Sequence, residues 1–231
     1  MPKIAASLVV PVSGPVRRNA VLELDSEGYV KSLSRGNAPF KEMAGVEYYS
    51  GILIPGLADM MCGSGQSGHQ LLGKGVRIAG ITGSPGDRDG YYQEDDNTPP
   101  GEPKKATWQN RYGRTVGYRI FDNMNHFREY FHPSGIGGVY YHKDSGENRP
   151  VMASTGGQDI FERMLELQEE PWNLSFSQLI DMATINGALV MGYDEVAGTF
   201  SPGAKPGISI IEGADLNKLR LLPVSRLRRL Y

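Results

Sequence analysis

The amino-acid sequence predicts an α/β fold. Segments rich in β-forming residues occur near both ends of the chain, at 3–54 and at 208–211. Between them, apolar residues at three- and four-residue spacing predict two amphipathic helices, at 159–170 and 175–191. The chain has 231 residues, which is enough for one large domain or two small ones with a buried core.

The N-terminal 55 residues are expected to form a small antiparallel sheet. Residues 4–10 favour a strand, and the polar run 25–28, Asp-Ser-Glu-Gly, is typical of a hairpin turn between two further strands. Residues 46–54 add another β-rich segment. It ends at the dipeptide Pro55-Gly56, which marks a turn.

The middle of the chain is broken by glycine and proline, of which the sequence has 30 and 15. Residues 84–106 carry charge, proline and glycine with almost no aliphatic side chains, so we expect an exposed, flexible loop there. Beyond it, a short helix is predicted at 122–131 and strands at 136–142 and 151–154.

The two predicted helices carry recognisable end signals. Asp159 stands where the first helix should have its N-cap. Ser175 and Gln178 have the spacing of a capping box, and Gly192 suits the residue just beyond the end of the second helix. These signals predict one continuous helix over 175–191.

Composition argues against several classes of partner. The formal net charge is −2 and the isoelectric point is near 6.1, so the chain has no general positive field to attract nucleic acid or an anionic membrane. The basic run 226–229 is interpreted as a solvated strand or tail. No apolar stretch approaches the ~20 residues of a membrane span, and the single cysteine excludes an intramolecular disulfide. We therefore expect a cytoplasmic protein.

Two separated segments resemble the amidohydrolase superfamily. Residues 54–63, I-P-G-L-A-D-M-M-C-G, are similar to the end of that family's first barrel strand, where Asp leads into His-x-His. Residues 179–192, L-I-D-M-A-T-I-N-G-A-L-V-M-G, and 197–211, A-G-T-F-S-P-G-A-K-P-G-I-S-I-I, resemble its C-terminal signature. The Lys-Pro-Gly run is similar to the deaminase- and chlorohydrolase-like branch.

The resemblance implies a fold and a division of the chain. Segments 1–55 and 196–231 would form a small composite β-sandwich, and segment 56–195 would form the barrel-like α/β region. A complete (β/α)8 barrel takes ~200 residues at the least, so only about four βα units fit in the middle. We therefore expect an incomplete (β/α) barrel-like middle beside the sandwich.

The metal-ligand positions that the resemblance implies are the main departure from the family. The two imidazoles of His-x-His fall on Met61 and Gly63, and the late Asp ligand falls on Gly156. Glycine has no side chain, and a methionine thioether is a poor ligand for Zn²⁺. No metal or other cofactor is expected at these positions.

Other residues could carry chemistry instead. A relocated zinc site could use His69, His142 and Asp144, although none of them has a standard ligand spacing. Cys62 follows a predicted strand and is a candidate nucleophile, and Asp159 is a second catalytic candidate. The competing interpretations are ordinary surface or core histidines, an inert cysteine and an N-cap aspartate.

Three functions remain open. The leading one is an amidohydrolase-like protein without the metal centre for C–N hydrolysis or deamination, retained as a pseudoenzyme that binds a small molecule, itself or an active paralogue. The first alternative is an active metal-dependent amidohydrolase or deaminase with relocated ligands and bound zinc. The second alternative is a structural or interaction module.

Overall fold

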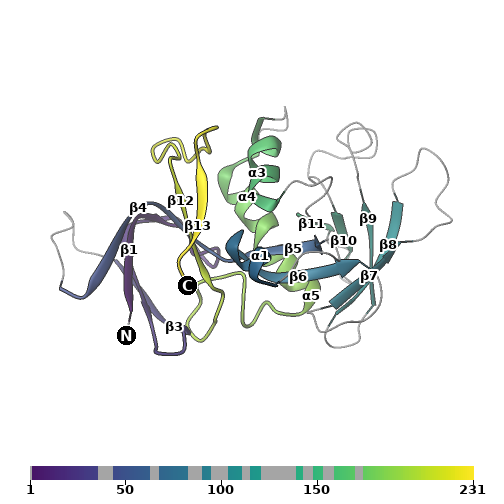
Figure 1. Cartoon of the computed structure of the whole chain (residues 1–231), viewed down its shortest axis with the longest axis horizontal. Helices are drawn as coiled ribbons and strands as arrows, with labels where there is room; N and C mark the ends of the chain where they lie inside the picture. The colour runs from purple at the N-terminus through teal and green to yellow at the C-terminus, as the bar shows by residue number, and fades with distance from the viewer. Residues whose placement is uncertain are drawn as a thin grey trace.

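The chain folds into two β-sheets with helices packed between and above them (Figure 1). The computed structural model describes residues 2–35, 44–62, 68–82, 90–94, 104–110, 115–120, 139–142, 148–152, 159–169 and 174–231. This confirms the α/β class. The predicted helix at 122–131 lies outside the described residues.

The first sheet, sheet A, joins strands from both ends of the chain. Its order is β13-β12-β4-β1-β2-β3. The strand bounds are β1 Lys3–Val9, β2 Arg17–Leu24, β3 Val30–Arg35, β4 Val46–Pro55, β12 Ile208–Glu212 and β13 Arg226–Arg229. The strand β4 lies at the centre, parallel to β1 on one side and antiparallel to β12 on the other. Because β4 bonds to both neighbours, strands from the two ends of the chain share one sheet.

The hairpin turn predicted at 25–28 is confirmed. The Asp25 carboxylate accepts hydrogen bonds from the backbone N–H groups of Glu27 and Tyr29, at 2.8 and 2.9 Å. These bonds, above all the one from Tyr29, hold the pKa of Asp25 below its ordinary value. Gly28 has a φ of 90°, which glycine adopts without strain.

The second sheet, sheet B, is built from the middle of the chain. Its order is β11-β10-β9-β8-β7-β6-β5. The strands β5, β6 and β7 are parallel, and β7 to β11 form an antiparallel meander. The bounds are β5 Leu57–Cys62, β6 Val76–Thr82, β7 Gly90–Glu94, β8 Lys104–Asn110, β9 Thr115–Ile120, β10 Val139–His142 and β11 Asn148–Val151, with helix α1 Gly68–Gly73 between β5 and β6.

This topology corrects two expectations for the middle. A barrel-like (β/α) repeat is not seen in the described residues, because successive strands from β7 onward are antiparallel and need no crossover helix. The loop expected over 84–106 is also wrong in part, since 90–94 and 104–106 belong to strands that pair with each other. The amino-acid composition of 84–106 does not reveal this pairing, because the pairing depends on backbone partners elsewhere in the chain.

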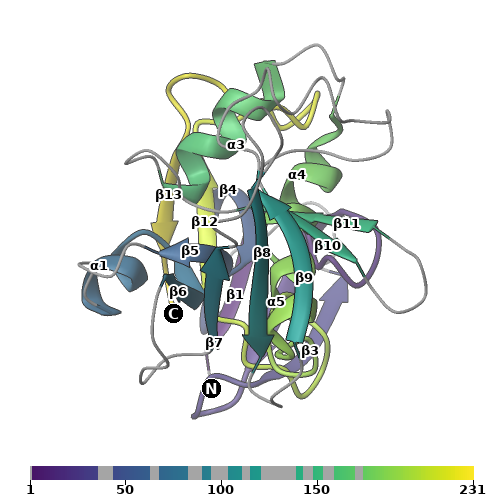
Figure 2. The ribbon, with the colours of Figure 1, turned by 90° about the vertical axis from the view of Figure 1, so that its right-hand side faces the viewer.

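Among the described residues, three helices lie between the last strand of sheet B and β12. They are α3 Ile160–Glu169, α4 Phe176–Ala183 and α5 Ile185–Met191. Helix α5 contacts β5, β8 and β11, so it lies against sheet B, as the side view shows (Figure 2). None of the helices in the described segments is long and apolar enough to cross a bilayer.

The predicted single helix over 175–191 is wrong at its centre. Its ends are as expected: Ser175 and Gln178 form a capping box, and Gly192 closes the C-terminus with a φ of 76°. At Thr184, however, the backbone turns to φ −133° and ψ −89°. The buried Thr184 hydroxyl donates to the carbonyl oxygen of Ile180 at 2.6 Å, which stabilises this break.

The break in the helix provides a hydrogen-bond acceptor for the residue that follows β11. In a continuous helix the Met182 carbonyl would accept the N–H of residue 186. Here it accepts the backbone N–H of Met152 at 3.1 Å. The break at Thr184 therefore ties the last strand of sheet B to α4.

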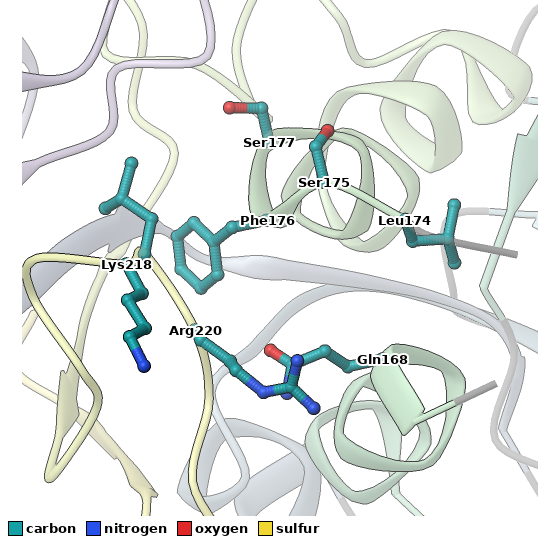
Figure 3. Close-up of a pocket in the computed structure, with 8 residues that line it drawn as sticks. Gln168, Leu174, Ser175, Phe176, Ser177, Lys218 and Arg220 are labelled. Atoms are coloured by element: carbon teal, nitrogen blue, oxygen red, sulfur yellow. The ribbon is translucent and has the colours of Figure 1, made fainter. Parts of the chain in front are cut away.

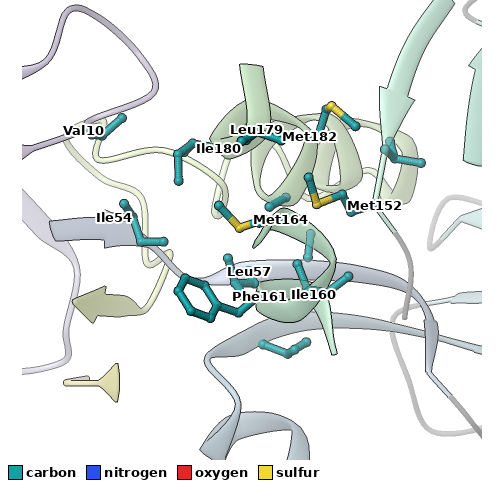
Figure 4. Close-up of a cluster of buried hydrophobic side chains, with 14 of the residues drawn as sticks. Val10, Ile54, Leu57, Met152, Ile160, Phe161, Met164, Leu179, Ile180 and Met182 are labelled. Atoms are coloured by element: carbon teal, nitrogen blue, oxygen red, sulfur yellow. The ribbon is translucent and has the colours of Figure 1, made fainter. Parts of the chain in front are cut away.

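Two apolar clusters hold the fold together. The larger one joins sheet B, the strand ends near Ile54 and helices α3 to α5, and methionine and isoleucine side chains interdigitate in it (Figure 4). The smaller one lies on the buried face of sheet A around Leu22, Leu53, Phe200 and Ile210. Leu53 and Ile54 are adjacent in β4 but belong to different clusters, as the two-residue period of a strand requires.

The two sheets meet where β4 ends and β5 begins, with only Gly56 between them. A Cβ on Gly56 would lie 2.6 Å from the carbonyl oxygen of Pro206 and 2.7 Å from the Cβ of Arg77. On the other side of this strand, a Cβ on Gly187 in α5 would lie 2.7 Å from the Cβ of Ala58. Small residues are therefore required at both contacts.

Replacing Gly56 with alanine should destabilise the protein. The new methyl group meets backbone at Pro206, which cannot move without displacing the adjacent strand, so we expect a loss of about 1–3 kcal/mol in the free energy of unfolding. Urea denaturation measures this loss. The control is Gly73→Ala, where nothing lies within 4 Å of the added Cβ. Equal midpoints for the two variants would contradict the tight junction.

Replacing Thr184 with valine tests the helix break. Valine keeps the volume but leaves the Ile180 carbonyl without the hydroxyl donor, which should cost about 1–3 kcal/mol. The Met152 amide should also lose protection against hydrogen exchange, because its acceptor becomes available only through the break. Unchanged stability together with an unchanged Met152 exchange rate would argue against this role.

Candidate functional site

The position where the resemblance places the first metal ligands is the end of β5. Met61 and Cys62 are the last residues of this strand, and Gly63 lies outside the described residues. Cys62 is opposite Ile81 of β6 in a parallel ladder. The segment that resembles the family's first barrel strand thus ends, in the structure, with a strand parallel to its neighbour β6.

The ladder between β5 and β6 is irregular at this position. Asp59 is opposite Ala79, but Cys62 is opposite Ile81, so β5 uses one more residue than β6 over this interval. The extra residue falls at Met60 or Met61. Such bulges alter the direction of a strand's side chains and are common beside active sites.

Three parallel strands end at the same edge of sheet B. Because β5, β6 and β7 run in one direction, their last residues, Cys62, Thr82 and Glu94, are brought to one edge. Open sheets of parallel strands bind ligands beyond this carboxyl edge. The backbone topology thus brings the ends of three parallel strands to a position suited to a ligand.

Three buried polar residues lie near the contact between β5 and α5. Asp59 is 2% exposed, and Thr184 and Asn186, on either side of the start of α5, are 0% and 8% exposed. Neither Asp59 nor Asn186 is without an interaction partner. These residues are part of the packed interface between α5 and β5, which the Gly187–Ala58 contact also defines.

The candidate zinc ligands are scattered over the fold. His69 is exposed near the start of α1, and His142 is the last residue of β10. Asp144 and Gly156 fall outside the described residues. Within the described segments, no group of three or more His, Cys, Asp or Glu residues could hold a metal ion.

The donor set at the family positions does not suit zinc. Structural and catalytic zinc sites use imidazole, thiolate or carboxylate ligands. At the end of β5 the resemblance assigns the ligand positions to a thioether and to a residue without a side chain. No step of a reaction is therefore derived through a metal at this position.

Asp159, the second catalytic candidate, is an N-cap. Its carboxylate accepts the backbone N–H of Glu162 at 2.9 Å, and the Glu162 carboxylate accepts the backbone N–H of Asp159 at 2.9 Å. This reciprocal pair is a capping box at the start of α3. The arrangement accounts for Asp159 in structural terms.

A pocket of about 430 Å³ lies elsewhere, between α3, α4 and the loop 215–222 (Figure 3). Phe176 projects from the first turn of α4 towards the loop, and Gln168 of α3 lies beside Arg220. Described residues that line this pocket are Gln168, Leu174, Ser175, Phe176, Ser177, Lys218, Leu219 and Arg220. We call this space the loop pocket.

The loop 215–222 is held in place by several hydrogen bonds. The Gln168 side chain donates to the carbonyl oxygen of Leu221 at 2.9 Å and accepts its N–H at 2.7 Å. The Asp215 carboxylate accepts the N–H groups of Asn217 and Lys218 at 2.9 and 3.0 Å. These bonds, with that from Lys218 first, lower the pKa of Asp215. Leu219 keeps a φ of 50°, unusual for a branched residue.

The sequence analysis missed the loop pocket because three separate segments form its walls. The helix start at Ser175 was predicted from its capping box, but the polar segment near 215–222 gave no sign of what it would contact. The local signal was limited to the turn-forming Asp215. The pocket forms because segment 215–222 packs against the start of α4, and this contact is visible only in the tertiary structure.

The basic run at the chain end is an edge strand of sheet A. Arg228 in β13 donates to Glu212 at 2.6 Å and lies over the ring of Tyr49, 5.4 Å from its centroid. Tyr49 in turn donates to Glu47 at 2.8 Å, and this hydrogen bond raises the pKa of Tyr49. Charge on an edge strand discourages pairing with another sheet, so the run has a structural explanation.

Comparison with known proteins shows a shared fold. No model of a known family and no curated protein matches the sequence. A candidate prolidase from Bifidobacterium longum superposes with a TM-score of 0.56 and 11% identity, over 94% of this chain and 90% of that one. An adenosine deaminase from Xanthomonas campestris with bound zinc gives a TM-score of 0.51 and 9% identity, over 96% and 86%. At these identities the likeness concerns the fold alone.

Substituting Asp159 should separate a capping role from a catalytic one. Asp159→Ala removes the acceptor for the Glu162 N–H and should cost about 1 kcal/mol of stability, whereas Asp159→Asn should retain most of it because asparagine caps equally well. Urea denaturation of the three proteins measures both effects. Full stability of the alanine variant would contradict the N-cap assignment.

Proposed function

We propose that this chain is an amidohydrolase-like protein that does not hydrolyse C–N bonds through a metal centre and that acts by binding. In an intact amidohydrolase a bound metal activates water for attack on the substrate. The residues at the end of β5 cannot supply that function here. The remaining activity is recognition of a small molecule, of a second copy of the chain or of an active relative.

The identity of the residues at the end of β5 carries this proposal. Met61 lies two residues beyond the buried Asp59, on the strand and at the spacing where the family has its first imidazole. The second position is Gly63. Losing both imidazoles removes two ligands at once, and no rearrangement of a glycine can replace one.

The fold supports the amidohydrolase-like part of the proposal. The superposed prolidase and adenosine deaminase are enzymes of the superfamily that the sequence resembles. Moreover, the two resembling segments meet in space: Gly56 packs against Pro206, and Ala58 packs against Gly187. The shared residues are thus those that position the two sheets, and they do not require a metal.

The alternative is an active hydrolase with relocated ligands. His69 favours it in one respect, because it is exposed at the start of the helix that follows β5 and is free of a core-packing role. In that case His69, His142 and Asp144 would hold zinc.

Zinc content decides between the two functions. The purified protein is incubated with zinc chloride, freed of excess metal on a desalting column and analysed by mass spectrometry, and we expect well under one zinc ion per chain. The same sample should not deaminate aminated purines. Parallel measurements on His69→Ala, His142→Ala and Asp144→Ala serve as comparisons.

Stoichiometric zinc together with deamination would overturn the proposal. If that zinc were lost in the His69 or His142 variant, the relocated site would be identified. Light scattering on the same samples tests self-association as the binding role, and a monomer would leave the small molecule and the active relative as partners.

A further inference from the structure

We infer that the loop pocket binds a small molecule with a carboxylate or phosphate group on a short apolar body. Its volume of about 430 Å³ falls in the ~300–1,000 Å³ range of ligand pockets. None of its described lining residues belongs to β5, β6 or β7. The inference therefore does not depend on the proposed loss of the metal centre.

The charge of the loop pocket is the first argument. Of the described residues that line it, two are cationic, Lys218 and Arg220, and none is acidic. Arg220 is already paired with both carboxylate oxygens of Glu169, at 2.9 and 3.0 Å. Lys218 is exposed and makes no salt bridge with a described residue, although it is near enough to Asp215 to lower that group's pKa. The ammonium group of Lys218 can therefore pair with an anionic group of a ligand.

The second argument is the combination of apolar and polar walls. Leu174 and Phe176 are 9% and 5% exposed and form an apolar wall. Ser175 and Ser177 line the pocket from the α4 side, and the Ser175 hydroxyl is engaged in the cap of α4, where it donates to the Gln178 side chain at 2.8 Å. Of the eight described lining residues, three are apolar and five are polar or charged, so one apolar wall faces a polar rim. Such a division is suited to orient a ligand that has one apolar and one polar end.

The third argument is that the pocket is formed before any ligand binds. The bonds from Gln168 to Leu221 and from Asp215 to the loop amides fix the wall that carries Lys218. The Leu222 N–H donates to the Ser225 hydroxyl at 2.8 Å, which fixes the other end of this wall. A fixed wall reduces the ordering cost of binding.

Titration with three eight-carbon probes tests this inference. Octanoate carries a carboxylate, octyl phosphate carries a phosphate, and octanol has no charge. Two-dimensional NMR of the full chain should show saturable shifts of the Phe176, Ser177 and Lys218 amides with at least one anion, weakening as salt is added. Octanol should bind at least about tenfold more weakly. The comparison of octanoate with octyl phosphate identifies the headgroup.

Two surface variants test the role of charge without disturbing the fold. Lys218→Gln removes the cation and should weaken anion binding about tenfold. Ser177→Glu places a carboxylate in the first turn of α4, where it should preserve or raise the stability of the helix while abolishing anion binding. The control is Lys74→Gln, an exposed lysine beyond the end of α1, which should bind as the wild type does.

Several results would overturn the inference. They are the absence of saturable shifts with both anions, equal binding of octanol, and unchanged affinity in the Lys218 and Ser177 variants. Zinc content and hydrolysis are measured separately, so failure of this inference and failure of the proposed function are distinguishable.

Discussion

The close contact at Gly56 sets the relation between the two halves of the molecule. The chain leaves sheet A at Pro55 and enters sheet B at Leu57, so a single residue separates two sheets with different partners. The carbonyl oxygen of Pro206 and the side chain of Arg77 from β6 both lie where a Cβ of residue 56 would be, and Arg77 donates to the carbonyl oxygen of Lys205 at 3.3 Å. Two residues further, Ala58 lies against α5, so the helix position is set by the same short segment.

Local signals in the sequence predicted local structure well. The hairpin at Asp25, the capping box at Ser175 and the glycine at 192 each act within a few residues of themselves, and the structure has all three. The break at Thr184 was not predictable in this way. It depends on packing against β5 and on the Met152 amide, which the helix sequence does not contain.

Pairing between distant segments was the part that the sequence concealed. Residues 90–94 have the composition of a loop, yet they are a strand because 104–110 lie beside them. The loop pocket illustrates the same limitation, since its walls come from α3, α4 and the chain end. The strand that carries Asp59 lies in one continuous run of the sequence, so its position could be read without knowledge of a distant partner.

The scaffold and the metal chemistry of this fold make different demands on the sequence. Close packing needs small side chains at Gly56 and Gly187, whereas zinc needs imidazoles at the positions of Met61 and Gly63. A sequence can therefore keep the small side chains that close packing needs and still lack the imidazoles.

The position of β4 at the centre of sheet A has a consequence for synthesis on the ribosome. Its partner β12 comes more than 150 residues later in the chain, so the apolar strand Ile52–Ile54 emerges long before that neighbour exists. Contacts of such long sequence separation slow folding and leave strand edges open to other chains. During translation this nascent segment should be a preferred substrate for chaperones that shield exposed strands.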